Sequence, residues 1–194
     1  MGEEKYQEKI KSLFERSPVV NFSSIGRIIQ DKKNIKQYSK QLVRNLILKG
    51  KIRRLAQGCY TKHNDPSLSV LCFKGYLGLQ DSLSIHNLWE QETIPVIITA
   101  NKVRQGIRKI LGVNVLIRRI DKRYFFGFEY LKYGNFYLPA SDIEKTFIDL
   151  VYFKENLEKE ALKNIKKEID GEKMRIYLKK YSKKFRERVF RILK

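Results

Sequence analysis

The sequence predicts an α+β protein in three parts. Residues 1–64 carry short amphipathic helical patterns and then a basic hairpin. Residues 65–153 carry β-branched and aromatic runs typical of strands, and residues 154–194 return to helical periodicity. A chain of 194 residues hides about 70% of the surface that it exposes when unfolded, so a hydrophobic core is expected. We expect the basic C-terminal extension to pack on the middle part.

Composition excludes several classes of protein. Hydrophobic residues make up 42% of the chain, too many for a disordered basic tail. No apolar run approaches the roughly 20 residues of a membrane span, and the N-terminal residues have no apolar signal-peptide core. Two cysteines, Cys59 and Cys72, are too few for a disulfide framework. We therefore expect a protein of the reducing cytoplasm with no membrane partner.

Positive charge is concentrated at the two ends of the chain. The net charge is +20, divided into +10 over residues 1–64, +2 over residues 65–153 and +8 over residues 154–194. The excess is one-sided, whereas the charge enrichment of thermophile proteins raises both signs together. A polyanion would relieve the self-repulsion. Nucleic acid is favoured over an anionic membrane surface and over a role in solubility alone.

The first part begins with two helical patterns. One apolar stripe predicts a helix over about Glu3–Arg16, formed by Tyr6, Ile10, Leu13 and Phe14. Pro18 ends this helix, because the residue before a proline avoids the α conformation. Ser23 and Ser24 are expected to cap a short second helix, and residues 31–34 are expected to form a turn.

The third helix, over about Ile35–Lys49, has two distinct faces. Its expected buried stripe is formed by Ile35, Tyr38, Leu42 and Leu46. The opposite face is polar and basic, and it consists of Lys36, Gln37, Lys40, Gln41 and Arg44. Arginine can bond guanine with two hydrogen bonds in the major groove of DNA, and glutamine can do the same with adenine.

A basic hairpin follows the third helix. Ala56–Gly58 form its turn and Cys59–Thr61 its return strand. Three helices and then such a hairpin is the order of a winged helix-turn-helix. We expect this domain to bind DNA, with phosphate or minor-groove contacts from Lys51, Arg53 and Arg54. The alternatives are a polar helix face that is only solvated and a winged helix that docks on proteins.

The middle part is expected to form a mixed or antiparallel sheet with flanking helices. Strands are predicted at Pro95–Ala100, Val113–Ile120, Tyr124–Tyr130 and Asn135–Leu138, and a helix at Leu79–Trp89. A further helix begins at Ser141 or Asp142. The tail, from about Glu155, is expected to form two basic amphipathic helices that are separated at Asp170-Gly171.

Several of these segments resemble a known family. They are the hairpin end at Gly58-Cys59-Tyr60 and the segments Leu77–Leu88, Ile94–Thr99 and Ala140–Leu150, the last containing Glu144-Lys145-Thr146. In this order they resemble the AbiEi-type antitoxins and related transcriptional regulators, over about residues 20–152. The resemblance implies a DNA-binding antitoxin that represses its own operon at inverted repeats. It also implies a nucleotidyltransferase toxin as partner, encoded next door, and a C-terminal domain that provides antitoxicity.

The sequence gives weaker support to catalysis. It contains neither a Gly-Ser pair nor an Asp-x-Asp motif, so it does not resemble the toxin. A nuclease-like enzyme would have to use Asp142, Glu144 or Asp149. We expect instead that Glu144 forms a capping box with Ser141 and that Lys145 and Asp149 form a weak i,i+4 pair.

No cofactor or metal site is expected. The two histidines, His63 and His86, do not combine with the cysteines in a zinc-ligand spacing. We therefore favour a DNA-binding regulator that is not an enzyme. The alternatives are a metal-dependent nuclease and a protein-docking winged helix with an RNA-binding tail.

Overall fold

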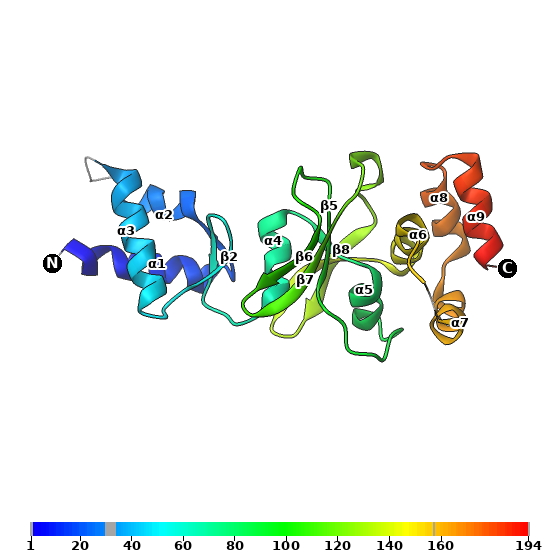
Figure 1. Cartoon of the computed structure of the whole chain (residues 1–194), viewed down its shortest axis with the longest axis horizontal. Helices are drawn as coiled ribbons and strands as arrows, with labels where there is room; N and C mark the ends of the chain where they lie inside the picture. The colour runs from blue at the N-terminus through cyan, green and yellow to red at the C-terminus, as the bar shows by residue number, and fades with distance from the viewer. Residues whose placement is uncertain (1, 30–33, 157, 194) are drawn as a thin grey trace. The chain divides into compact units, whose positions relative to one another are not determined.

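The computed structural model describes residues 2–29, 34–156 and 158–193 (Figure 1). It divides into two compact units. Unit 1 comprises residues 1–72 and 109–113, and unit 2 comprises residues 73–108 and 114–194. Helices and strands are combined in both, as the predicted α+β class requires. Residues 31–33 of the predicted turn lie outside the described residues.

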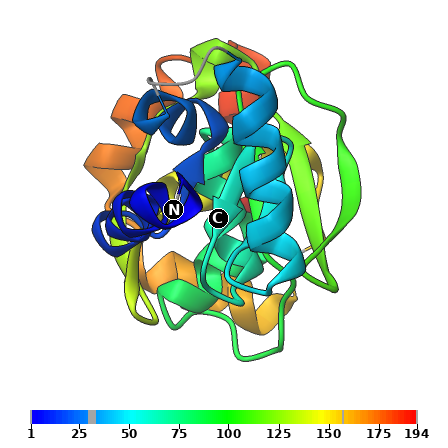
Figure 2. The same cartoon turned by 90° about the vertical axis from the view of Figure 1, so that its left-hand side faces the viewer.

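Unit 1 combines three helices with a small sheet. The helices are α1 (Gly2–Arg16), α2 (Phe22–Ile28) and α3 (Ile35–Leu48), and the strands are β1 (Val20–Asn21), β2 (Arg53–Ala56) and β3 (Cys59–Thr61). The antiparallel sheet has the order β1-β3-β2, so β3 lies between the strand that follows α1 and the strand that follows α3. Figure 2 shows α3 in light blue and α1 in dark blue.

The core of unit 1 is built from one stripe on each helix. Ile10 and Phe14 of α1, Ile25 of α2, and Leu42 and Leu46 of α3 are all at most 5% exposed. Tyr6 packs edge-on against Tyr38, with ring centroids 5.9 Å apart. The predicted stripes on the first and third helices are therefore confirmed, with one exception below.

Two details of the helix ends differ from the sequence prediction. Ile35 was expected in the core but is 38% exposed, because it occupies the first position of α3. Ser23 and Ser24 do not cap α2. The N-cap is Asn21, because β1 leads directly into the helix, and its side chain makes no capping hydrogen bond.

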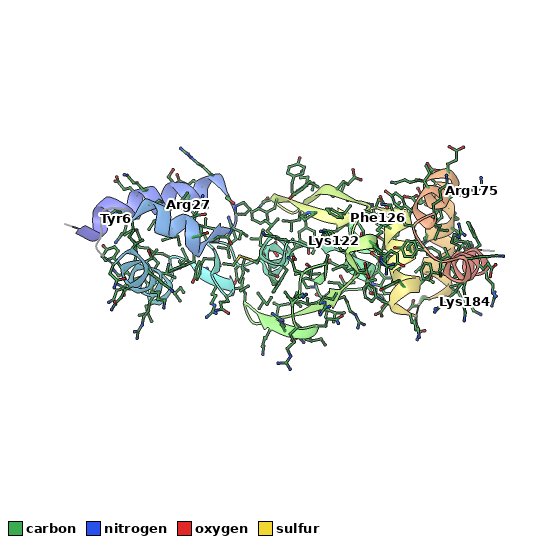
Figure 3. The ribbon with its side chains drawn as sticks, turned by 90° about the horizontal axis from the view of Figure 1, so that it is seen from above. Tyr6, Arg27, Lys122, Phe126, Arg175 and Lys184 are labelled. Atoms are coloured by element: carbon green, nitrogen blue, oxygen red, sulfur yellow. A yellow bond between two sulfur atoms is a disulfide. The ribbon has the colours of Figure 1, made fainter. Side chains whose placement is uncertain are left out.

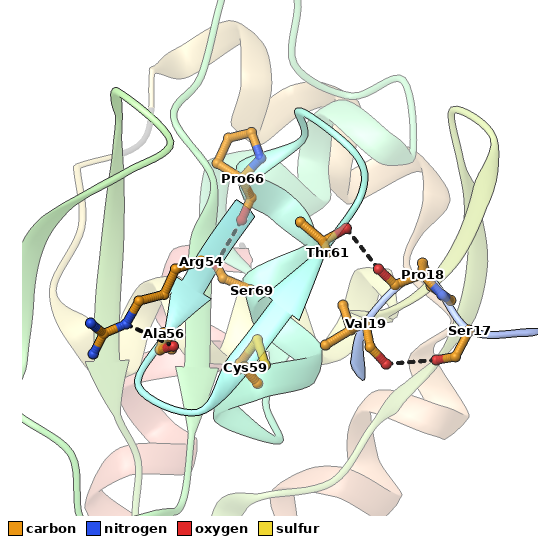
Figure 4. Close-up of a disulfide and its surroundings, with 10 residues drawn as sticks. Ser17, Pro18, Val19, Arg54, Ala56, Cys59, Thr61, Pro66 and Ser69 are labelled. Carbon is orange, nitrogen blue, oxygen red and sulfur yellow. Dashed lines mark hydrogen bonds between the residues drawn. A yellow bond between two sulfur atoms is a disulfide. The ribbon is translucent and has the colours of Figure 1, made fainter. Parts of the chain in front are cut away.

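Cys59 and Cys72 form a disulfide, which the cysteine count did not predict (Figure 4). It joins β3 to α4 (Ser69–Phe73), which follows the 3-10 helix η1 (Pro66–Leu68). Two hydrogen bonds stabilise the backbone segments next to the disulfide. The Thr61 hydroxyl donates to the carbonyl of Pro18 at 2.7 Å, and the Ser69 hydroxyl donates to that of Pro66 at 2.6 Å.

Unit 2 contains a mixed sheet of six strands in the order β6-β7-β5-β4-β9-β8. The strands are β4 (Tyr76–Leu77), β5 (Val96–Thr99), β6 (Gly106–Ile110), β7 (Val113–Arg119), β8 (Phe128–Tyr133) and β9 (Phe136–Ser141). β5 pairs parallel to β7 and antiparallel to β4, whereas β4 pairs parallel to β9. The sequence predicts a mixed or antiparallel sheet, and the sheet is mixed.

The strand predicted at Tyr124–Tyr130 begins four residues later. Lys122–Tyr124 form the 3-10 helix η2, and the chain then turns at Gly127, which has a positive φ of 71°. β8 begins only after this turn and pairs antiparallel with β9, with Tyr130 opposite Pro139. The predicted strand combined two segments that this turn separates.

The helices of unit 2 contribute most of its core. They are α5 (Leu79–Ile85), α6 (Ile143–Phe153), α7 (Lys159–Glu168), α8 (Gly171–Leu178) and α9 (Lys183–Leu193). Buried residues of the tail, including Ile165, Met174 and Val189, belong to the same core cluster as Phe147 of α6. Figure 3 shows the side chains of these helices, with Arg175 and Lys184, both exposed, labelled.

The described residues of the tail form three helices where the sequence predicts two. The break at Asp170 is confirmed, because the Asp170 carboxylate caps α8 by accepting from the backbone of Glu172 at 2.8 Å. A second break lies at Ser182, whose hydroxyl accepts from the backbone of Phe185 at 3.4 Å and so starts α9. Among the helices of residues 2–29, 34–156 and 158–193, none is both long and apolar enough to span a membrane.

Candidate nucleic-acid interface

The polar face predicted on the third helix is exposed on α3. Lys36, Gln37, Lys40, Gln41 and Arg44 are all exposed, while Leu42, Val43 and Leu46 are buried on the other side. Asn34 caps the helix by accepting from the backbone of Gln37 at 3.3 Å, and its amide donates to the Gln37 side chain at 3.1 Å. Two hydrogen bonds between the exposed residues Asn34 and Gln37 therefore stabilise the first turn of α3.

Basic side chains from α3 and β2 meet at one shallow depression of about 220 Å³. Lys40 and Arg44 of α3 and Arg54 of β2 supply its charge. Its apolar lining is Phe22, Val43, Ile47, Leu48 and Tyr60. Leu48 is 74% exposed, so this surface presents apolar as well as basic groups to a partner. We call it the basic depression.

The hairpin arginines point to opposite faces of β2, because successive strand residues alternate. Arg54 lies opposite Tyr60 of β3 and donates from Nε to the carbonyl of Ala56 at 3.3 Å, which holds its guanidinium at the hairpin. Arg53 lies opposite Thr61 and is exposed. Arg54 is therefore brought together with the α3 residues, and Arg53 is not among the residues that line the basic depression.

Lys51 lies apart from this group. Its ammonium donates to the side chain of Gln7 on α1 at 3.3 Å, and it lines a different hollow. Within the described part of the chain, none of the basic side chains at the basic depression forms an ion pair within 4.0 Å. Their charge is therefore available to an anionic partner.

The carboxylates of the enzyme alternative are buried and paired. Asp149 is fully buried on α6 and forms an ion pair with Lys145, which is also fully buried. It accepts a second hydrogen bond, from the Tyr76 hydroxyl, at 2.7 Å. Burial raises the pKa of Asp149 and lowers that of Lys145, while their mutual attraction acts in the opposite direction.

The other two carboxylates fix one tail helix, α8, to α6. Asp142 is the N-cap of α6, accepting from the backbone of Lys145 at 2.8 Å, and it also accepts from the Tyr177 hydroxyl at 2.7 Å. Glu144 accepts from the backbone of Asp170 at 2.8 Å. Lys173 bridges Asp142 and Glu144 at 3.2 and 3.1 Å. Partial burial lowers the pKa of Lys173, but hydrogen bonds and charges of these two carboxylates raise it above its ordinary value.

The predicted capping box is therefore wrong, because Glu144 reaches α8 instead of the start of its own helix. Ser141 is occupied elsewhere. Its hydroxyl contacts that of Thr146 at 2.7 Å, and its carbonyl accepts from the Ser82 hydroxyl at 2.8 Å. His86 Nε2 lies 2.8 Å from the same carbonyl. Within residues 2–29, 34–156 and 158–193, no group of three or more His, Cys, Asp and Glu residues could hold a metal ion.

The sequence reasoning did not include the apolar members of the basic depression. Ile47 and Leu48 interrupt the polar face of the third helix, and 37% and 74% of their surfaces are exposed. These two apolar residues on an otherwise polar helix face are the sequence feature that could have indicated the apolar lining of the basic depression. An apolar pair at the end of a basic helix face indicates either packing or a contact surface, and periodicity alone does not separate the two.

Comparison with known proteins gives the fold only. No protein-family model and no curated protein sequence matches the chain. The structure is similar to the crystal structure of the RV2827C protein from Mycobacterium tuberculosis, with a TM-score of 0.61 and 12% sequence identity. The superposition covers 97% of this chain and 76% of that chain. At this identity the similarity concerns the arrangement of helices and strands and not the site.

Proposed function

We propose that this protein is a sequence-specific DNA-binding transcriptional regulator and that unit 1 is its winged helix-turn-helix. The element order α1-β1-α2-α3-β2-β3 supports this assignment, because β2 and β3 form the hairpin that follows the third helix. In such a domain the exposed face of α3 enters the major groove, and the hairpin contacts the DNA backbone or minor groove.

One observation carries the proposal: Lys40, Arg44 and Arg54 line a single depression although they come from two elements. If the polar face of α3 were only solvated, no basic residue of the hairpin would be needed beside it. A DNA backbone passing this surface would be contacted from both elements at once, and the release of its counterions would add to the affinity. Lys36, Gln37 and Gln41 extend the same helix face and provide donors for base edges.

The resemblance to AbiEi-type antitoxins extends the proposal. The regulator then represses its own operon at inverted repeats in the promoter, and unit 2 counteracts a nucleotidyltransferase toxin encoded next door. One of the segments that carry the resemblance, Ala140–Leu150, contains Glu144, Lys145 and Thr146, which are buried on α6. Glu144 accepts from the backbone of Asp170 and pairs with Lys173, so its role in the proposal is to hold α8 against α6.

The enzyme alternative is not favoured by any contact of the described residues. Asp142, Glu144 and Asp149 each accept hydrogen bonds from the protein itself, and at most 10% of each side chain is exposed. The arrangement accounts for these carboxylates by packing and ion pairing alone.

A mobility-shift competition tests the proposal. The labelled probe is the upstream region of the protein's own gene, and the competitor is a scrambled duplex of equal length and composition. At a salt concentration of about 150 mM, we expect the native probe to stay bound against excess scrambled duplex. Equal competition by both duplexes would reject sequence-specific binding.

A further inference from the structure

A second hollow in unit 1 shares no residue with the basic depression. It has a volume of about 430 Å³, within the usual range of small-molecule sites. Helix α1 forms one wall with Gln7, Glu8, Ile10, Lys11 and Phe14. The other wall comes from the end of α3 and from the hairpin, with Leu46, Lys51, Ile52 and Lys62. We call it the α1 groove.

The floor of the α1 groove is apolar. Ile10, Phe14, Leu46 and Ile52 are between 2% and 5% exposed, so the core fixes their positions and only a small part of each side chain faces the groove. Such a floor binds an apolar body without rearrangement of the protein. The favourable free energy comes mainly from removing the apolar body of the ligand from water, because little of the floor is exposed.

The rim of the α1 groove is cationic. Lys11, Lys51 and Lys62 stand against one acid, Glu8, among the described residues that line it. Lys51 donates to the neutral side chain of Gln7, and Lys62 forms no ion pair with any residue that the structure describes. Lys11 lies 4.0 Å from Glu15, and this exposed pair is weak. The described rim therefore carries an excess of positive charge, with three lysines and one glutamate.

We propose that the α1 groove binds a small amphipathic anion, with an apolar body on the floor and one carboxylate or sulfonate at Lys51 and Lys62. The assignment follows from charge complementarity. A purely apolar ligand would leave the lysines unused, and a polyphosphate would place charge against an apolar floor.

The position of the α1 groove suggests that this ligand regulates DNA binding, a step that rests on the proposed function. The backbone amides of Lys51 and Ile52 donate to the carbonyl of Leu46 at 2.9 and 3.4 Å. These bonds join the end of α3 to the start of β2, and all three residues line the groove. A ligand here contacts the connection between the two elements that carry Arg44 and Arg54. Any movement of that connection changes the position of Arg44 relative to Arg54, and therefore their contacts with DNA.

Calorimetric titration of the full chain with 2-naphthoate tests the site. We expect one site per chain and an affinity at least about ten-fold higher than for the neutral 2-naphthalenemethanol or for acetate. Lys51→Gln and Lys62→Gln should each weaken naphthoate binding by about three- to five-fold, and Glu8→Gln should strengthen it. Lys9→Gln is the matched control, because Lys9 is exposed on the same helix and does not line the groove.

Three results would overturn the assignment. Equal binding of the neutral compound would show that the lysines are not used, and equal effects of Lys9→Gln and Lys62→Gln would show only a response to net charge. A dimer in sedimentation that Lys62→Gln dissociates would assign the groove to a second copy of the chain.

The regulatory step has a separate readout. With naphthoate at saturation, the affinity for the upstream duplex should change by at least about five-fold, and Lys62→Gln should abolish the change. If the chain binds naphthoate but no DNA, the proposed function fails and the site stands. If DNA binding is intact and naphthoate does not bind, the site fails and the proposed function stands.

Discussion

Lys145 and Asp149 form an ion pair one turn apart on α6, and neither side chain has any solvent exposure. The pair is enclosed by aromatic rings. The Lys145 ammonium lies 5.6 Å from the ring centre of Tyr76 and 5.3 Å from that of Phe126. Because the Tyr76 hydroxyl also bonds Asp149, the pair connects α6 to β4. Buried ion pairs of this kind are sensitive to the loss of one partner.

Replacement of Lys145 by methionine should destabilise unit 2 strongly. Asp149 would then keep a buried charge with only the Tyr76 hydroxyl as donor, and we expect the free energy of unfolding to fall by about 3–5 kcal/mol. Urea unfolding followed by circular dichroism measures this loss. The double variant Lys145→Met/Asp149→Leu should recover most of it, because no charge remains buried. A loss below about 1 kcal/mol in the single variant would contradict the buried pair.

Gly127 should not tolerate a side chain. Its φ is +71°, and a Cβ atom there would lie 2.9 Å from Lys145 Cβ and 2.9 Å from Tyr177 Cε2. We expect Gly127→Ala to cost about 2–4 kcal/mol, from the left-handed backbone and the clash together. Gly134→Ala is the control, because Gly134 has φ +56° and no atom within 4 Å of a Cβ. The control should lose only about 1–2 kcal/mol, and equal losses would contradict the contact with Lys145 and Tyr177.

Stability should decrease at alkaline pH. Burial, followed by the charge of Asp149, raises the pKa of Tyr76 and of Tyr181 above the ordinary value of 10.0. Above that pH the unfolded chain loses these phenol protons while the folded chain keeps them. The free energy of unfolding then falls as pH rises, by up to about 1.4 kcal/mol per pH unit for each tyrosine. Below pH 10 this contribution is fully present.

Two tyrosine variants separate the effect of burying a phenol from the effect of its hydrogen bond to Asp149. The Tyr181 hydroxyl is buried without a hydrogen-bond partner among the described residues, so Tyr181→Phe should leave stability at pH 8 unchanged or increase it. The same variant should also reduce the fall of the free energy of unfolding above pH 10 by the contribution of one tyrosine. Tyr76→Phe should instead lower stability at pH 8 by about 1–3 kcal/mol, because Asp149 loses a donor. Denaturant titrations at pH 8 and pH 10.5 give both quantities, and identical behaviour of the two variants would contradict this explanation.

Much of the fold could be predicted from the sequence because helical periodicity is a local signal. The stripe on α1 and the buried face of α3 both follow from apolar residues at helical spacing. The strands β4 and β1 were missed because each has only two residues, too few for any periodicity. The break at Ser182 was missed because the apolar spacing continues from α8 into α9, and only the Ser182 hydroxyl marks the new helix.

The buried network on α6 could not be predicted for a different reason. Lys145 and Asp149 at i,i+4 are typical of a solvated helix surface, and the sequence predicts a weak pair there. The rings that lie over the Lys145 ammonium belong to Tyr76 and Phe126, which come from other parts of the chain. The same holds for the α1 groove. Lys51 was assigned to the DNA contact from its neighbours in sequence, whereas its position next to Gln7 depends on the packing of α1.

The central claim is that the basic depression contacts DNA. A comparison of two variants that lose the same number of charges tests this claim most directly. The variant Lys40→Gln/Arg44→Gln/Arg54→Gln removes three charges at the basic depression, and Lys9→Gln/Lys102→Gln/Lys132→Gln removes three exposed charges that line neither this depression nor the α1 groove. Competition between the upstream and scrambled duplexes at about 150 mM salt gives the specificity ratio of each. We predict a loss of at least about 100-fold in upstream affinity for the first variant, with the ratio falling toward one, and a nearly unchanged ratio for the second. Equal losses in both variants, with the ratio preserved, would contradict a DNA-reading role for this surface.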